Sequence, residues 1–301
     1  MSLALLFPGQ GSQSVGMGKA LCEASRAARR VFEEADEILG FPLSRICFDG
    51  PEAELKRTAI TQPAILTHSI AALEDLRDRF PERLDGASLA AGHSLGEYSA
   101  NVAAGALPFA RAVALVHARG RFMQEAVPEG VGAMAAIVGL AADAVDEACR
   151  ESAGGEVVSP ANYNSPEQTV IAGHAAAVAR ASEACLARGA KRAIPLPVSA
   201  PFHCALMSPA RERMAPLLAD APFADAAMAV VTNVDASPET SGARLRDALV
   251  RQIDSPVRWV ASVRRLASDG VDRALEIGPG NVLAGLVKRI EKGIRVEGYG
   301  G

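Results

Sequence analysis

Short apolar runs alternate with longer segments of helical period along most of this 301-residue chain. Residues 3–7 and 88–93 are β-type runs, and a Gly-rich turn and a helical segment follow each of them. The pattern returns near the C-terminus, with expected strands at 228–233 and 273–277 and expected helices at 243–253, 257–267 and from Asn281. This order is typical of a parallel sheet covered by helices. Aromatic residues make up only 4% of the chain, so Ala, Leu, Val and Ile must build the core, and we expect an α/β fold.

The middle of the chain has a different order of elements. It reads strand, helix, strand, strand, helix, strand, at residues 134–138, 142–151, 156–162, 168–172, 175–188 and 191–195. That order is the split βαβ, or ferredoxin-like, unit. We therefore expect a small subdomain at residues 130–197, inserted into a larger α/β subdomain formed by residues 1–129 and 198–301.

Charge and composition exclude several classes of protein. The formal net charge of −4 gives no global attraction to nucleic acid or to an anionic membrane. The apolar opening at 1–7 has no positive residues before it and ends at Pro8, which does not match a signal peptide. No apolar run approaches the roughly 20 residues that span a bilayer. The five cysteines are scattered and lack C-x-x-C pairing, so we expect a cytoplasmic protein with reduced thiols and no metal site.

A G-x-S-x-G motif at 92–96 places Ser94 between an apolar strand and the helical segment 97–106. Such a motif is either an ordinary Gly-rich turn or a nucleophile elbow. The strand before it and the helix after it favour the elbow, in which a sharp turn holds the serine in a strained conformation at a helix N-terminus.

A nucleophilic serine needs a base, and His203 is the favoured candidate among five histidines. It lies in an irregular segment directly after the inserted subdomain. The other four lie in helical runs, beside the serine, or at the end of an expected strand: His68, His117, His93 and His174. The alternative for His203 is a loop histidine with a purely structural hydrogen bond.

Two further motifs are ambiguous by themselves. The PGQGSQ segment at 8–13 lacks the spacing of a phosphate loop. It is either a tight turn or the source of an oxyanion-hole amide at Gln10, with the Leu95 amide as the second donor. Arg119 is either a solvated charge on a helix or, if it points inward, a bidentate partner for a substrate carboxylate.

Taken together, eight segments resemble the malonyl-CoA:acyl-carrier-protein transacylases of type II fatty-acid synthesis, in the same order and over almost the whole chain. They are PGQGSQ at 8–13, ITQPA at 60–64, GHSLGEY at 92–98, RGRFMQ at 119–124, GAMAAIVGL at 132–140, PFH at 201–203, SPVRW at 255–259 and EIGPGNVL at 276–283. The resemblance implies an α/β-hydrolase-like large subdomain with a parallel sheet and a ferredoxin-like (βαββαβ) insertion.

The resemblance also implies a ping-pong acyl transfer in the cytoplasm. Ser94 would accept the malonyl group from malonyl-CoA, with His203 as general base and acid, and the phosphopantetheine thiol of an acidic acyl carrier protein would then take it. By the same resemblance Arg119 pairs with the malonyl carboxylate, and Gln10 and Leu95 supply the oxyanion donors. The main-chain carbonyl of Gln252 orients the histidine, in place of an Asp. No cofactor or metal is implied, binding to the carrier is transient, and a monomer is the family's expectation.

Phe202, directly before the histidine, resembles the malonyl-type pattern of related polyketide acyltransferases, whereas many fatty-acid enzymes carry serine there. A trans-acting polyketide acyltransferase and the malonyl transferase of a malonate decarboxylase therefore remain alternatives with the same chemistry. A serine thioester hydrolase is an alternative from another class, and it requires an acid such as Asp143 or Asp146. Cys204 is a rival nucleophile beside His203, although no elbow surrounds it.

Overall fold

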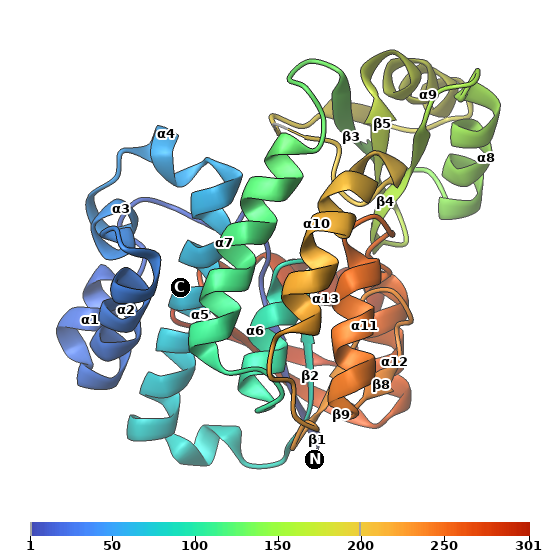
Figure 1. Cartoon of the computed structure of the whole chain (residues 1–301). Helices are drawn as coiled ribbons and strands as arrows, with labels where there is room; N and C mark the ends of the chain where they lie inside the picture. The colour runs from blue at the N-terminus through green and yellow to red at the C-terminus, as the bar shows by residue number, and fades with distance from the viewer. Residues whose placement is uncertain (1, 199) are drawn as a thin grey trace.

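The computed structural model describes residues 2–198 and 200–301 and contains two sheets flanked by helices (Figure 1). Two residues of the expected segments lie outside the described residues. They are Met1, at the start of the apolar opening, and Ser199, shortly before the candidate histidine.

The main sheet has six strands in the order β10-β9-β1-β2-β7-β8, and all its pairings are parallel except that of β7 with β8. Its strands are β1 (Ser2–Phe7), β2 (Ala87–Gly92), β7 (Ala229–Val231), β8 (Pro238–Glu239), β9 (Val271–Ile277) and β10 (Arg295–Tyr299). The central strands β1 and β2 lie side by side, so the loops that leave their carboxyl ends emerge next to each other.

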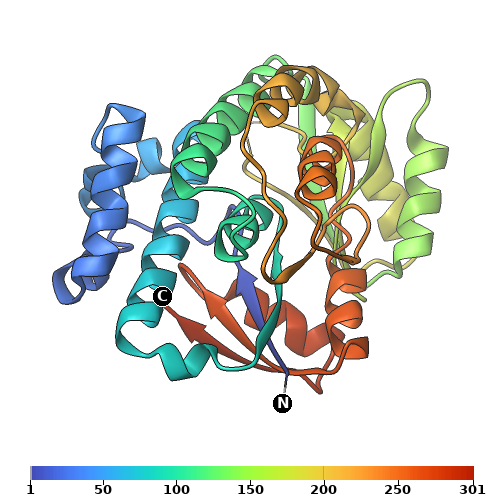
Figure 2. The ribbon, with the colours of Figure 1, turned by 60° about the horizontal axis from the view of Figure 1, so that its bottom comes forward.

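Helices cover both faces of the main sheet (Figure 2). Residues alternate along β1: Leu3, Leu5 and Phe7 join the larger core, whereas Ala4 and Leu6 face the opposite side. The larger core is covered by α1 (Lys19–Ala24), α2 (Arg26–Leu39), α3 (Leu43–Asp49), α4 (Glu52–Leu55), α5 (Thr58–Arg79), α6 (Gly96–Ala103), α7 (Phe109–Glu125), α10 (Ser208–Ala219) and α11 (Gly242–Gln252). The opposite face is covered by α12 (Trp259–Ser268) and α13 (Val282–Ile290). Across residues 2–198 and 200–301, every helix is too short or too polar to cross a bilayer.

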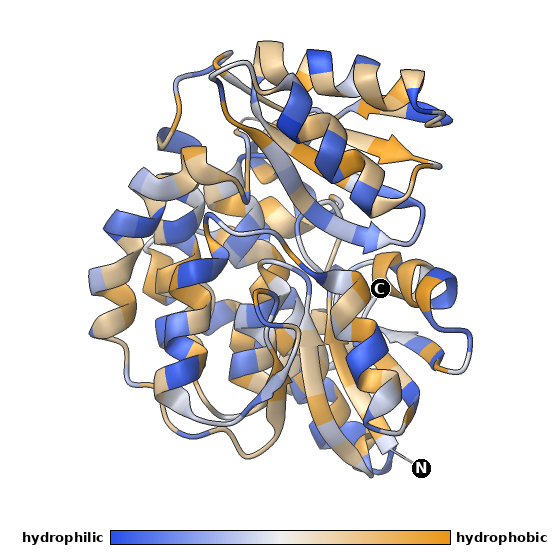
Figure 3. Cartoon of the chain, turned by 90° about the vertical axis from the view of Figure 1, so that its right-hand side faces the viewer, coloured by the Kyte–Doolittle hydropathy of each residue, from blue (hydrophilic) through white to orange (hydrophobic). Residues whose placement is uncertain are grey.

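The second sheet is antiparallel, has the order β4-β5-β3-β6, and lies above the main body in Figure 3. Its elements are β3 (Gly132–Val138), α8 (Ala142–Ser152), β4 (Val158–Ser165), β5 (Gln168–His174), α9 (Ala175–Ala187) and β6 (Arg192–Pro195). Ala135 and Ile137 of β3 pack with α8 and α9, whereas Met134 and Ala136 join the larger core of the main body. The second sheet therefore shares buried contacts with the main body along β3.

The expected α/β fold with two subdomains is confirmed, and the order of elements in the insertion matches the ferredoxin-like unit. The exact limits of the insertion at 130–197 stay a prediction. Two strands, β8 and β10, are absent from the sequence-based expectation. The two-residue β8 pairs only with β7, and the polar β10 forms the other edge of the sheet beside β9, so neither carries the apolar run of a buried strand.

Candidate active site

Ser94 lies at the sharp turn between β2 and α6, with its backbone in the left-handed region at a φ of 52°. A left-handed non-glycine residue costs about 1–3 kcal/mol and persists only when its surroundings enforce it. A Cβ on Gly92 would lie 2.0 Å from the Gly96 carbonyl oxygen, and one on Gly96 would lie 2.0 Å from the Phe7 carbonyl oxygen. Both glycines are therefore required for the tight approach of strand, turn and helix.

His203 reaches the serine from the loop before α10. Its Nε2 lies 2.7 Å from Ser94 Oγ, and its Nδ1 lies 2.9 Å from the main-chain oxygen of Gln252. Because a carbonyl can only accept, Nδ1 carries the proton and Nε2 is free to accept the serine proton. Burial, followed by the positive charge of Arg119, lowers the pKa of His203 to about 3, so the imidazole is neutral at physiological pH.

Arg119 is fully buried, with 1% of its surface exposed, which rules out the solvated helix-face interpretation. Its Nη1 donates to Gln62 Oε1 at 2.8 Å, and its Nη2 donates to Gln252 Oε1 at 2.9 Å and to Ser94 Oγ at 3.2 Å. The guanidinium lies 5.6 Å from the centre of the Tyr98 ring. A buried cation this close to the candidate nucleophile is suited to bind an anionic group held beside Ser94.

The two candidate oxyanion donors belong to the neighbouring loops after β1 and β2. Phe7 pairs with Gly92 at the ends of these strands, so Gln10 and Leu95 follow from adjacent positions. Within the described residues, neither the Gln10 nor the Leu95 amide N–H donates to a protein acceptor. Two free amides near Ser94 are the arrangement that an oxyanion hole requires.

A cavity of about 120 Å³ opens over the serine. Helices and loops of the main body line it together with two strands of the second sheet, β3 and β4. The lining residues are Gln10, Gln62, His93, Ser94, Arg119, Met123, Met134, Asn162, Leu196, Val198, Phe202 and His203. Phe202, with only 9% of its surface exposed, forms part of the apolar wall. The cavity suits a short acyl group with a charged end at Arg119.

Three residues of this site received no role from the sequence. Gln62 lies in the ITQPA segment and accepts a hydrogen bond from Arg119. Glu97 follows the elbow in the GHSLGEY segment, and Asn233 follows β7; both are fully buried. Their polar side chains at otherwise apolar positions are a signal that could have been noticed, but only the fold brings Asn233 to the serine.

The acid that a hydrolase triad needs does not reach the histidine. Asp146 lies on α8, where its carboxylate accepts a hydrogen bond from Tyr163 at 3.0 Å, and Asp143 lies on the same helix. The position that a triad acid would occupy on His203 is taken by the Gln252 carbonyl. The hydrolase alternative therefore lacks the acid that its triad requires.

The thiol of Cys204 is poorly suited to act as the nucleophile. Cys204 is buried and its thiol donates to the Pro201 carbonyl at 3.1 Å, and burial raises its pKa to about 11. Among residues 2–198 and 200–301, His, Cys, Asp and Glu side chains form no group of three or more that could hold a metal ion.

Comparison with known proteins agrees with this geometry. The family described as "Acyl transferase domain" matches residues 4–297. The malonyl CoA-acyl carrier protein transacylase of Escherichia coli (strain K12) is 52% identical over 287 residues, which cover 95% of this chain and 92% of the relative. An acyl carrier protein S-malonyltransferase from Vibrio cholerae superposes with a TM-score of 0.96 at 48% identity, covering 99% of this chain and 96% of that one. The same TM-score, identity and coverage hold for a malonyl-transacylase solved in complex with a type II polyketide acyl-carrier protein. A Ser–His pair with a buried arginine, in a chain this similar over its whole length, makes the protein a member of the acyltransferase family of malonyl-CoA:acyl-carrier-protein transacylases.

Proposed function

We propose that this chain transfers the malonyl group of malonyl-CoA to the phosphopantetheine thiol of an acyl carrier protein through an ester on Ser94. The observation that carries the proposal is the position of Ser94 Oγ, 2.7 Å from His203 Nε2 and 3.2 Å from Arg119 Nη2. One neighbour can remove the serine proton, and the other can hold the carboxylate of the acyl group that the serine receives.

In the first half-reaction Ser94 Oγ attacks the thioester carbonyl carbon of malonyl-CoA, while its proton passes to His203 Nε2. The carbonyl oxygen becomes an oxyanion, which the amides of Gln10 and Leu95 stabilise. The C–S bond then breaks, and the departing sulfur of coenzyme A takes the proton from His203. The malonyl group remains on Ser94 as an ester.

In the second half-reaction coenzyme A has left and the phosphopantetheine thiol of the carrier enters. His203 removes the thiol proton, and the sulfur attacks the ester carbonyl through an oxyanion in the same two-amide site. Ser94 leaves with the proton that His203 returns. The carrier departs with the malonyl thioester and the enzyme is restored, so no cofactor is consumed or required.

The choice of acyl group follows from the buried charge. A malonyl carboxylate gives the buried Arg119 cation an anionic partner, whereas an acetyl group leaves that cation without an anion. Phe202 narrows the cavity and disfavours branched acyl groups by its bulk. The volume of about 120 Å³ agrees with a short chain.

We assign the reaction to fatty-acid synthesis, where malonyl groups on a carrier extend the chain. The malonyl-transacylase solved with a type II polyketide carrier protein is as similar to this chain as the Vibrio cholerae enzyme is. Transfer of malonyl groups to a polyketide carrier is therefore the second candidate. The five cysteines are free and buried, which suits a reducing compartment, and we place the enzyme in the cytoplasm.

The test is intact-mass spectrometry of the protein mixed with malonyl-CoA in the absence of an acceptor. We expect one malonyl adduct on the wild type, none on Ser94→Ala, and little adduct from acetyl-CoA. Addition of the holo carrier should move the adduct from enzyme to carrier. Release of coenzyme A without any adduct would instead indicate a hydrolase.

A further inference from the structure

Glu97 is a fully buried carboxylate on α6, three residues after the nucleophile. Its Oε2 accepts two hydrogen bonds, from the Asn233 main-chain N–H at 2.9 Å and from Gln252 Nε2 at 2.7 Å. Its Oε1 has no hydrogen-bond partner in the part of the chain that the structure describes. Burial raises the pKa of this carboxyl to about 7, although both donors oppose the rise.

The two partners of Glu97 hold opposite ends of the serine residue. Asn233 Oδ1 accepts the Ser94 main-chain N–H at 2.7 Å, and Gln252 Nε2 also donates to the Ser94 main-chain oxygen at 2.9 Å. Asn233 Nδ2 donates to the Gly92 carbonyl at 2.7 Å, which ties the same amide to the end of β2. The left-handed backbone of Ser94 is therefore held from both sides. Glu97 contacts the Gln252 side chain directly and contacts Asn233 through its main-chain N–H.

The Gln252 amide also connects Glu97 to the other two functional side chains. With Nε2 directed at Glu97, its Oε1 faces Arg119 and accepts the Nη2 hydrogen bond. A rotated amide would place its NH2 group against the guanidinium, where donor meets donor. The main-chain oxygen of the same residue accepts from His203 Nδ1.

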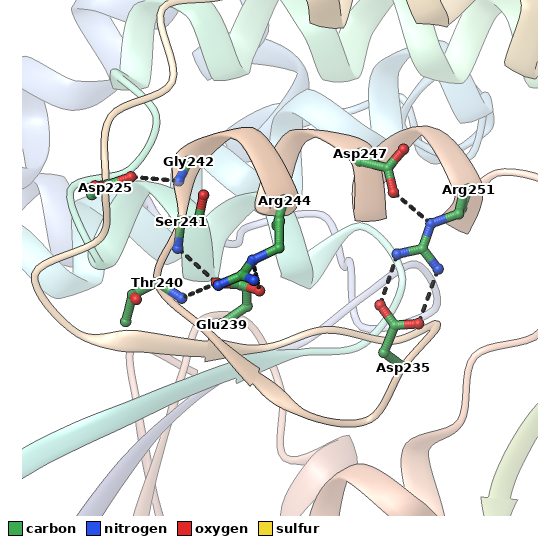
Figure 4. Close-up of polar contacts among 9 residues, drawn as sticks. All are labelled: Asp225, Asp235, Glu239, Thr240, Ser241, Gly242, Arg244, Asp247 and Arg251. Atoms are coloured by element: carbon green, nitrogen blue, oxygen red, sulfur yellow. Dashed lines mark hydrogen bonds and ion pairs between the residues drawn. The ribbon is translucent and has the colours of Figure 1, made fainter.

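The segments that carry Asn233 and Gln252 are locked to each other at the surface (Figure 4). Arg251, at the end of α11, binds both carboxylate oxygens of Asp235 at 2.9 and 2.7 Å, and its Nε donates to Asp247 at 2.7 Å. The end of α11 and the turn after β7 are thereby fixed relative to each other. In the interior Glu97 bridges the same two segments, beside the longer direct contact of 3.4 Å between Gln252 Nε2 and Asn233 Oδ1.

We propose that Glu97 is a positioning residue for acyl transfer, acting through Asn233 and Gln252 to set the Ser94 backbone, the imidazole of His203 and the guanidinium of Arg119. The proposal rests on the function proposed above. Loss of the carboxylate removes the 2.7 Å acceptor of Gln252 Nε2 and the acceptor of the Asn233 main-chain N–H, so both segments are held less firmly. The reacting atoms then occupy their productive arrangement less often, while the cavity that receives the malonyl group keeps its walls.

The experiment compares single-turnover loading of malonyl-CoA in the wild type, Glu97→Ala, Glu97→Gln and Asn233→Ala, followed by intact mass over a range of substrate concentrations. Wild-type loading tests the proposed function by itself, so its failure is distinguishable from failure of this inference. We expect Glu97→Ala and Asn233→Ala to lower the maximal loading rate by about 100-fold, since small misplacements of reacting groups have effects of that order. The substrate concentration at half-maximal rate should change by no more than about twofold.

Glu97→Gln should recover most of the rate, because its amide oxygen can still accept from Asn233 and Gln252. The double variant Glu97→Ala/Asn233→Ala should be no slower than the slower single variant, within about twofold, since both changes break one network. Independent effects would multiply instead.

Glu276 provides the matched control, because it is also a fully buried carboxylate that accepts two backbone N–H groups, those of Leu283 and Ala284 at the start of α13. Glu276→Ala should destabilise the fold without slowing loading per folded molecule, where the folded fraction is measured by thermal unfolding.

The inference is overturned if Glu97→Ala loads at the wild-type rate, if Glu276→Ala slows loading as much, or if the double variant multiplies the single effects. If Glu97→Ala does not fold, Glu97→Asp decides, because its shorter side chain withdraws the carboxylate from the Asn233 N–H and Gln252 Nε2: a wild-type rate overturns the inference and an approximately 100-fold loss supports it.

Discussion

The main-chain oxygen of Gln252 lies 2.9 Å from His203 Nδ1, where a serine hydrolase of the triad type has a carboxylate. A neutral carbonyl orients the imidazole as well as an acid does, but it stabilises the imidazolium less. Burial and the charge of Arg119 disfavour that cation further and lower the pKa of His203 to about 3. In the proposed reaction, the imidazolium formed during attack would therefore return its proton readily to the leaving sulfur. A thioester is reactive enough to need no stronger base.

Replacement of Arg119 tests whether this cation selects the acyl group. Arg119→Ala should lower malonyl loading by about 100-fold or more, since a buried charge without its partner costs about 3–5 kcal/mol. Acetyl loading should fall much less. Arg121→Ala is the matched control, because Arg121 is exposed two residues away and lies over the Phe122 ring at 5.2 Å. An unchanged ratio of malonyl to acetyl loading in Arg119→Ala would refute the carboxylate-binding role.

Cys204 should be dispensable although it adjoins the base. Its buried thiol, with a pKa raised to about 11, is protonated at neutral pH and donates to the Pro201 carbonyl. Cys204→Ser keeps a donor for that carbonyl, so we expect an unchanged loading rate and a loss of stability of about 1 kcal/mol. Intact mass after malonyl-CoA addition measures the adduct, with Ser94→Ala as the negative control. Loss of the adduct in Cys204→Ser would reassign the nucleophile.

The elbow and the order of strands could be predicted because they depend on local sequence. Gly92, Ser94 and Gly96 lie within five consecutive residues, and the central strands β1 and β2 are runs of mostly apolar residues. The support of the site could not be predicted in this way. Asn233 and Glu97 are brought together only by the pairing of β2 with β7, and their hydrogen bonds are invisible to periodicity.

The burial of Arg119 also could not be predicted from local sequence, although the residue was a candidate for substrate binding. Its place late in a helix indicates nothing about the direction of its side chain, and most such arginines are solvated. The close packing of α7 against α5 buries it, and Gln62 of α5 then provides an acceptor. Resemblance to a family indicated the role, whereas composition and spacing left it open.

The elbow glycines should be among the least replaceable residues of the large subdomain. Gly96→Ala places a Cβ 2.0 Å from the Phe7 carbonyl oxygen, so the turn must move away from β1. We expect a loss of stability of about 3 kcal/mol together with loss of loading. Gly285→Ala in α13 is the control, since its Cβ would meet no heavy atom within 4 Å among the described residues. Removing a helical glycine there should stabilise the protein by about 0.5–1 kcal/mol, as measured by denaturant unfolding. Equal stabilities of the two variants would contradict the close contact at the elbow.

The pH dependence of loading should lack the titration of an ordinary histidine. An imidazole with the usual pKa of about 6.5 would lose most of its basic form by about pH 5, and the rate would fall with it. With a pKa lowered to about 3, His203 stays neutral throughout that range, so the rate should be nearly constant between about pH 5 and 6.5. Glu97, with its pKa raised to about 7, titrates near this window and faces both Arg119 and Asp235, so the profile is also measured in Glu97→Gln.

The lowered pKa of His203 also makes the free energy of unfolding depend on pH. Below about pH 6.5 the unfolded chain binds a proton at this histidine and the native protein does not, so His203 makes unfolding easier as the pH falls toward 3. Quenched-flow loading and denaturant unfolding across the pH series measure the two effects separately. A tenfold loss of rate per pH unit below about 6.5 in both wild type and Glu97→Gln would show that the base titrates normally and that Arg119 and burial do not hold it neutral.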